Sequence, residues 1–224
     1  MSILKKIIVL TPHPDDETLG CGGTLLKHIN QGDKVYWLII TKMGDYFAQE
    51  KITKRSKEIE TVASIYQFEK TFELGFEAAT LDQVSYGDLI GKISEVFQEI
   101  QPNIIFVPYP GDIHSDHKVV FDATIACTKW FRYPSVDKVL AYETLSETDF
   151  TINPDANGFK PNIFVNIVPY LDKKIEIMKV YDSEISEFPF PRSEKAIQSL
   201  ASVRGAASGF EAAEAFMLLK ERIL

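Results

Sequence analysis

Apolar positions recur along this chain with two different spacings, and the two spacings alternate. Short runs of continuous apolar residues, such as VYWLIIT, are typical of strands that are covered on both faces. Longer stretches repeat apolar residues every three or four positions, as at Ile59, Val62 and Tyr66, and this period predicts helices. The predicted strands span residues 6–10, 35–41, 71–74, 104–108, 138–143 and 163–167. The predicted helices span residues 17–30, 52–66, 86–101, 119–131, 170–183, 194–202 and 212–220.

Strands that alternate with helices of this length predict βαβ units and therefore a parallel sheet. The expected fold is α/β, a Rossmann-like three-layer sandwich with a mainly parallel central sheet. A chain of 224 residues has room for one such domain, so residues 1–224 are predicted to form a single domain. The segment EFPFPR at 187–192 has the most loop-like composition and is predicted to be a connector or a lid.

Charge and composition narrow the possible partners. The net charge of −8 argues against nucleic-acid binding, which needs a cationic face, and against docking on an anionic membrane. No apolar stretch approaches the roughly twenty residues of a membrane span, and the run IIVL is too short for a signal peptide. Cys21 and Cys127 are the only cysteines, too few for a disulfide framework. The protein is therefore predicted to be cytoplasmic, with no integral membrane segment.

Three of the four histidines lie in two short segments, TPHPDDE and GDIHSDH, and each segment directly follows a predicted strand. The carboxyl ends of parallel strands meet at one edge of a sheet, where ligands bind. The side chains expected at that edge are His13, Asp15, Asp16, Glu17, Asp112, His114, Asp116 and His117. So many carboxylates repel one another unless a cation compensates them, and a metal ion supplies that compensation.

Imidazole and carboxylate are suitable ligands for zinc. His13, Asp16 and His117 make a three-ligand set that leaves positions open for water, the pattern of a catalytic ion. Asp15 is then a natural general base for the water that the ion activates. His114 can be protonated, with Asp116 as the partner that holds its tautomer and raises its pKa.

The run from Asp15 to Glu17 also fits a plain acidic helix N-terminus, where carboxylates interact favourably with the helix dipole. For Glu17 two roles stay open, a hydrogen bond to backbone amides and a contact with a metal-ligating residue.

The segments TPHPDDETLGCGG and HSDH resemble the signatures of the PIG-L, or LmbE-like, family of deacetylases. The resemblance implies an LmbE-like fold and zinc-dependent removal of an N-acetyl group from an amino sugar or glycoconjugate. It implies that His13, Asp16 and His117 bind zinc and that Asp15 is the base. It further implies that His114 stabilises the oxyanion or acts as the acid, with Asp116 behind it.

Further matches extend the resemblance along the chain. Arg55 and Glu58 in KRSKE match the family's R-x-x-E, in which the arginine is expected to reach the substrate. The segments LGF, YET and RGAASGFEAAEAF also match, and they carry Arg204 in a glycine-rich context. Asp112 precedes HSDH where some members have another polar residue. Asp112 and Arg204 are therefore candidate substrate-binding residues, and the resemblance implies a homo-oligomer, a trimer or a hexamer.

Two other functions use the same residues. Two histidines and one carboxylate also form the facial triad of non-haem Fe²⁺ oxygenases, so Fe²⁺ is an alternative ion. A metal-stabilised binding module needs the ligands alone, without Asp15 or the His114–Asp116 pair. The sequence thus predicts a metal-dependent amide hydrolase that acts on a small N-acetylated sugar-like substrate, with zinc as the expected ion.

Overall fold

One seven-stranded sheet organises the part of the chain that the structure describes, with the strand order β3-β2-β1-β4-β5-β7-β6. The structure is a computed structural model and describes residues 4–152 and 158–223. The strands are β1 (Lys6–Thr11), β2 (Lys34–Lys42), β3 (Lys70–Glu77), β4 (Ile104–Pro108), β5 (Lys138–Tyr142), β6 (Ile163–Asn166) and β7 (Ala213–Glu221). The α-helices are α1 (Asp16–Asn30), α2 (Gln49–Tyr66), α3 (Tyr86–Ile100), α4 (Ser115–Ala126), α5 (Leu171–Met178) and α6 (Glu194–Ala206). None of these helices has both the length and the apolar character needed to cross a membrane.

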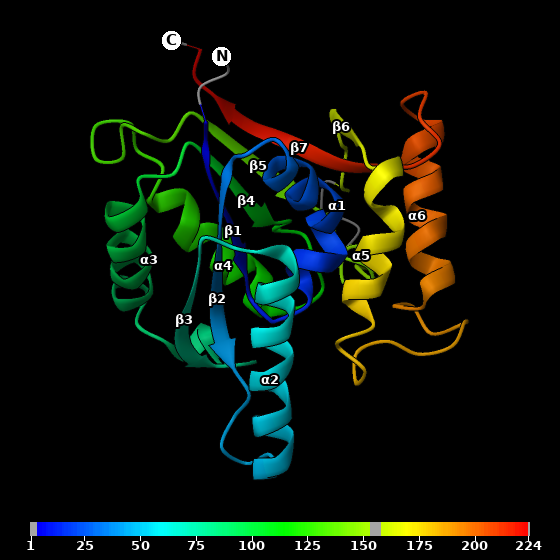
Figure 1. Cartoon of the computed structure of the whole chain (residues 1–224). Coiled ribbons are helices and arrows are strands. Elements are labelled where there is room, and N and C mark those ends of the chain that lie inside the picture. Colours follow the sequence, from blue (N-terminus) through cyan, green and yellow to red (C-terminus); the bar gives the residue numbers. More distant parts are fainter. Residues whose placement is uncertain (1–3, 153–157, 224) are drawn as a thin grey trace.

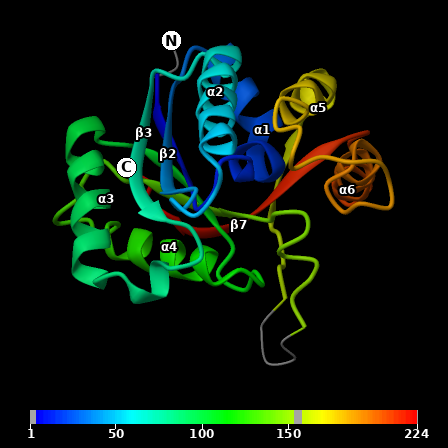
Figure 2. The ribbon, with the colours of Figure 1, turned by 90° about the horizontal axis from the view of Figure 1, so that it is seen from below.

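Neighbouring strands from β3 to β5 pair in parallel, whereas β7 runs antiparallel to both of its neighbours, β5 and β6. Helices α3 and α4 cover one face of the sheet, and α1, α2 and α5 cover the other (Figures 1 and 2). The predicted three-layer α/β architecture with a mainly parallel sheet is confirmed.

Each face of the sheet has its own apolar core. In strand β2, seven consecutive residues of the nine are buried, which explains its continuous run of apolar residues. Val35 and Trp37 belong to the core beneath α1 and α2, and Tyr36 and Leu38 belong to the core beneath α3 and α4. A strand covered on both sides needs apolar side chains at odd and even positions alike.

The predicted helix at 212–220 is wrong, because this segment is strand β7. Its composition of Ala, Glu, Leu and Lys favours a helix in isolation. In the fold, the segment pairs with β5 along one edge and with β6 along the other, and its first four residues are buried. Helix propensities of such residues differ by less than about 0.7 kcal/mol each, so pairing and burial decide the conformation.

The helix predicted at 119–131 begins earlier, at Ser115, and ends at Ala126. The HSDH motif therefore forms the N-cap and first turn of α4, where the His114 side chain accepts the N–H of Asp116. Segment 187–192 contains no helix or strand and joins α5 to α6, as expected of a connector.

The strand order reverses between β1 and β4, which are neighbours in the sheet although β2 and β3 separate them in sequence. Ligands of open α/β sheets bind at the carboxyl ends of the strands at such a reversal. Residues 12–15 follow β1 and residues 109–114 follow β4, so both histidine segments lie at this position.

Helix α1 packs against the sheet through glycines. A Cβ atom at Gly20 would lie 2.3 Å from Cδ2 of Tyr142, and one at Gly23 would lie 2.8 Å from Cβ of Ile167. Both distances are too short for real Cβ contacts. Glycine at these two positions of GCGG therefore allows the close approach of α1.

We predict that Gly20→Ala lowers the free energy of unfolding by about 1–3 kcal/mol, because the new methyl group overpacks the Tyr142 ring. The matched control is Gly91→Ala in α3, where an added Cβ meets no atom of the described residues within 4 Å. That change is expected to stabilise the protein by about 0.5–1 kcal/mol through helix propensity. Urea unfolding of both variants measures the difference, and an unaltered Gly20→Ala protein would contradict the packing argument.

Candidate active site

A cavity of about 460 Å³ opens at the carboxyl ends of the five parallel strands. This volume is within the range of roughly 300–1,000 Å³ typical of small-molecule sites. Its wall includes His13, Asp15 and Asp16 after β1, Tyr46 after β2, Ala79 after β3, His114 after β4, and Glu147 after β5. Segments from distant parts of the sequence thus meet in one site, as the strand reversal requires.

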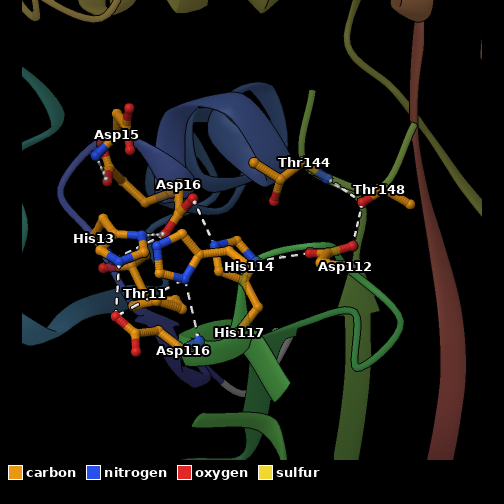
Figure 3. A network of polar contacts seen from close by, with 12 residues as sticks. Thr11, His13, Asp15, Asp16, Asp112, His114, Asp116, His117, Thr144 and Thr148 are labelled. Atoms are coloured by element: carbon orange, nitrogen blue, oxygen red, sulfur yellow. Dashed lines mark hydrogen bonds and ion pairs between the residues drawn. The ribbon is translucent and has the colours of Figure 1, made fainter. Parts of the chain in front are cut away.

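His13, Asp16 and His117 converge beside this cavity (Figure 3). Nδ1 of His13 lies 3.6 Å from one carboxylate oxygen of Asp16, and Nε2 of His117 lies 3.5 Å from the other. One ligand atom from each residue lies within 4.8 Å of the other two. Tetrahedral zinc with bonds of about 2.0–2.1 Å separates its ligand atoms by about 3.3 Å, so the spacing suits one shared ion.

A carboxylate behind each histidine fixes which ring nitrogen is free. Nε2 of His13 lies 3.1 Å from Asp116, and Nδ1 of His117 lies 2.7 Å from Asp112. An ionised carboxylate only accepts, so each of these ring nitrogens donates a proton. Nδ1 of His13 and Nε2 of His117 are therefore the nitrogens that keep lone pairs when the rings are neutral, and both lie against Asp16, the arrangement found behind many metal-ligating histidines.

The buried imidazole of His117 gives the clearest sign that a cation belongs here. Its Nε2 is buried and makes no hydrogen bond within residues 4–152 and 158–223. Burial by itself lowers the pKa of His117, but the carboxylates of Asp16 and Asp112 outweigh it and raise that pKa to about 9. The surroundings therefore favour positive charge at a position where a neutral ring would offer a ligand, and the residues fit a divalent ion.

A second group, His13 with His114 and Asp116, also has ligand-like spacing. Its carboxylate is already bound, since Asp116 accepts the backbone N–H of Ala79 at 2.7 Å as well as the proton of His13. Asp116 therefore orients His13 by this contact, and the set with His117 is the better candidate for a metal site.

Asp15 occupies the N-cap of α1 with φ of +122°, a left-handed conformation that is strained for a residue other than glycine. Two contacts hold it there. Its N–H donates to Glu17 at 3.1 Å, and its side chain accepts from Arg192 at 2.9 Å. Burial and then the neighbouring Asp16 raise the pKa of Asp15 well above its usual range, while Arg192 opposes that shift.

Glu17 is fully buried and bonds the protein interior rather than a metal-ligating residue. One carboxylate oxygen accepts the Asp15 N–H, and the other accepts the hydroxyls of Thr18 at 2.6 Å and Tyr181 at 2.9 Å. Of the two roles left open by the sequence, the structure favours the backbone contact.

His114 lines the cavity and presents a defined tautomer. The backbone N–H of Asp116 donates to Nδ1 of His114 at 3.2 Å, so Nε2 carries the proton of the neutral ring. Burial and the neighbouring His13 lower the pKa of this imidazole. They outweigh Asp116, which raises that pKa as expected. The Asp116 carboxylate itself lies nearer to His13, at 3.1 Å, than to His114, at 3.9 Å.

Arg55 lines the cavity, but its guanidinium is largely engaged by the protein. Nη1 donates to the carbonyl of Pro14 at 3.1 Å, Nε pairs with Glu58 at 3.2 Å, and Nη2 pairs with Glu184. The contact with Pro14 supports the turn that carries Asp15. A substrate contact of Arg55 stays a prediction.

Asp112 and Arg204 lie away from the cavity wall. Asp112 accepts from His117 and, at 2.5 Å, from the hydroxyl of Thr148, so it orients a histidine instead of facing a substrate. Arg204 forms a two-pronged ion pair with Glu143, at 2.7 and 2.5 Å, and lines a separate small cavity. A substrate contact by either residue stays a prediction that these positions do not favour.

Sequence reasoning missed Arg192, whose Nη1 bridges Asp15 at 2.9 Å and Glu184 at 3.0 Å. It lies at the end of the EFPFPR segment, far from both histidine motifs in the sequence. An arginine that ends a Pro-rich connector has no motif of its own. Only the proximity of α5, α6 and the β1 turn in space reveals this role.

Residues 8–128 match the family model described as PIG-L, GlcNAc-PI de-N-acetylase. The diacetylchitobiose deacetylase of Thermococcus kodakarensis is 26% identical over 227 residues, which cover 94% of this chain and 82% of that protein. A conserved protein of Thermus thermophilus superposes with a TM-score of 0.79 at 23% identity, covering 99% of this chain and 97% of that one. The N,N'-diacetylchitobiose deacetylase of Pyrococcus horikoshii gives a TM-score of 0.78 at 21% identity, with coverages of 96% and 84%. The two superpositions show a shared fold.

We predict that Arg192→Met lowers the free energy of unfolding by about 1–2 kcal/mol, because it leaves buried Asp15 without its cation. The cost stays below that of a fully buried pair, since the Arg192 side chain is 24% exposed. In a double-mutant cycle, Arg192→Met should destabilise the Asp15→Asn protein by at least about 0.5 kcal/mol less than it destabilises the original protein. Lys179→Met, which breaks the exposed pair with Glu194, serves as the control and should cost little. Additive effects of the two site substitutions would contradict the coupling.

Proposed function

This chain belongs to the PIG-L family, and from that premise we propose that it is a metal-dependent hydrolase that removes an N-acetyl group from an amino-sugar or glycoconjugate substrate. The observation that carries the proposal is the grouping of His13, Asp16 and His117, with the unpartnered Nε2 of His117, beside a cavity that Asp15 lines. Zinc as the ion, a single domain over residues 1–224 and a trimeric or hexameric assembly belong to the same proposal.

The relatives support the choice of reaction. The similar proteins of Thermococcus and Pyrococcus are deacetylases of an N-acetylated disaccharide by their names. A binding module would not need Asp15, which the protein holds in a strained conformation beside the ligand set. The combination of ligand set and adjacent base favours hydrolysis of an amide bond.

A divalent ion held by His13, Asp16 and His117 would polarise the acyl carbonyl and lower the pKa of water at the site. Asp15 then takes a proton from the attacking water, because its carboxylate lines the cavity next to Asp16. The same carboxyl group can return the proton to the departing amine nitrogen as the carbon–nitrogen bond breaks. Acetate and a free amine are the products.

His114 is placed to stabilise negative charge on the carbonyl oxygen. Its Nε2–H is the proton-bearing nitrogen, since Nδ1 accepts the N–H of Asp116. A neutral N–H donor fixed before the reaction stabilises an oxyanion without reorganisation. This role suits the neutral ring better than proton donation by an imidazolium does.

We predict that zinc raises the melting temperature of the chelator-treated protein and that His117→Ala abolishes this response. Ligand binding to the folded state alone stabilises by about 2.7 kcal/mol when the free ion is at 100 times its Kd. Thermal unfolding with and without zinc, together with metal analysis, measures the effect.

The control for this experiment is His28→Ala. His28 pairs with Asp33 outside the site, so this variant should begin at a lower melting temperature and keep the zinc response. A His117→Ala protein that still binds one zinc would remove the assigned ligand set.

Oxygen consumption by the Fe²⁺-loaded protein, with no acetate release, would favour the oxygenase alternative.

We predict that Asp15→Asn keeps the metal and loses turnover by about 10²- to 10⁴-fold, the usual contribution of a general base. Asparagine tolerates positive φ, so the backbone at this N-cap should persist. Acetate release from N-acetylated sugars, measured at matched zinc content, tests the role. Near-normal turnover with full metal content would exclude Asp15 as the base.

A further inference from the structure

The loop after β5 carries three side chains with unpartnered polar atoms. Thr144, Ser146 and Glu147 all line the cavity that contains His13 and Asp16. The atoms Thr144 Oγ1, Ser146 Oγ and Glu147 Oε2 are buried and have no hydrogen-bond partner in the part of the chain that the structure describes. Each such atom costs about 1–3 kcal/mol, and native proteins contain few of them.

The clustering of these atoms indicates a ligand. The three residues that carry these atoms lie within four consecutive positions, and all three line one cavity wall. The two hydroxyls belong to short side chains, in which a rotation about one bond redirects the oxygen toward the cavity. A ligand that supplies hydrogen bonds at this wall would remove the free-energy cost of these unpartnered atoms.

The backbone of the loop is held in a specific, strained form. Ser146 has φ of +71°, in the left-handed region that residues other than glycine seldom adopt. The N–H of Glu147 donates to the carbonyl of Thr144 at 3.1 Å, and its carbonyl accepts the N–H of Ile113 at 3.2 Å. Strain of this kind is concentrated at functional sites, where the surroundings over-determine the conformation.

A continuous chain of hydrogen bonds ties this loop to the candidate metal site (Figure 3). The Thr144 N–H donates to Thr148 at 2.8 Å, Thr148 donates to Asp112 at 2.5 Å, and Asp112 accepts from His117 at 2.7 Å. The loop therefore has a fixed position relative to His117. A substrate group bound by the loop would be positioned relative to the reacting acyl group.

The types of polar atom define the ligand chemistry. The carboxylate of Glu147 only accepts hydrogen bonds, whereas the hydroxyls of Thr144 and Ser146 donate and accept. The matching group carries several hydroxyls on neighbouring carbons. A phosphate or carboxylate substituent cannot donate to Glu147 and would be repelled by it.

We propose that Thr144, Ser146 and Glu147 form a subsite that binds the ring hydroxyls of the sugar while its N-acetyl group lies at His13, Asp16 and His117. This inference rests on the proposed function. It narrows the substrate to sugars whose ring hydroxyls carry no phosphate or other anionic substituent. Glu147 accepts the strongest of these hydrogen bonds, because its carboxylate is ionised when it does so.

The test uses the zinc-loaded full chain, with N-acetylglucosamine and N,N'-diacetylchitobiose as substrates and acetate release as the readout. Glu147→Gln should raise KM about tenfold to a hundredfold and change kcat less, since it weakens a charge-assisted hydrogen bond. Thr144→Val and Ser146→Gly should each raise KM about threefold to tenfold. The control Asp149→Asn alters an exposed carboxylate of the same loop outside the cavity wall and should keep KM unchanged.

Two further readouts separate recognition from a structural role. The melting temperatures of the three variants should stay equal to the original or rise, because Thr144 Oγ1, Ser146 Oγ and Glu147 Oε2 accept no hydrogen bond from the described residues and glycine relieves the φ of Ser146. Deoxy analogues of the better substrate complete a double-mutant cycle. For the analogue that lacks the hydroxyl bound by Glu147, the rise in KM caused by Glu147→Gln should shrink to about twofold or less.

The outcomes distinguish this inference from the proposed function. An active original protein with unchanged KM in all three variants would overturn the subsite alone. Lower melting temperatures together with equal losses on every deoxy analogue would assign the loop a structural role and would also overturn it. No acetate release by the original zinc-loaded protein from any N-acetylated sugar would overturn the proposed function instead.

Discussion

Buried negative charge at the candidate active site has to be compensated, and the positions of several distant side chains follow from this. The carboxylates gathered where β1 and β4 end are Asp15, Asp16, Asp112 and Asp116, and all four residues are buried. Asp112 and Asp116 each accept a proton from an imidazole, and Asp15 pairs with Arg192. Asp16 lies against Nδ1 of His13 and Nε2 of His117, and positive charge at this position completes the balance.

This balance explains features that are remote in the sequence. The connector between α5 and α6 brings Arg192 to Asp15, and α2 brings Arg55 to the carbonyl beside it. Both arginines share Glu184 as a counter-ion, so the turn after β1 is supported from two sides. A strained residue at an N-cap persists only under such support, and the support holds the proposed base next to the ligand set.

Sequence reasoning succeeded where a local pattern has one physical interpretation. The burial of β2 on both faces follows from the continuous apolar character of its sequence. The HPDD and HSDH segments could be placed at one edge because parallel strands share their carboxyl ends. Reasoning failed at residues 212–220, where pairing with two strands outweighed helix propensity, and it did not foresee Arg192 or the loop after β5.

The fold class, the family resemblance and the residues that meet at the strand reversal follow from the amino-acid sequence, because they depend on periodicity and on motifs that are local in the chain. Which carboxylate orients which histidine depends on the folded chain. Asp116, expected behind His114, lies against His13, and Asp112, expected to face the substrate, lies against His117. Hydrogen bonds act over about 3 Å, and the distance between residues far apart in the sequence is set by how the sheet and its helices pack.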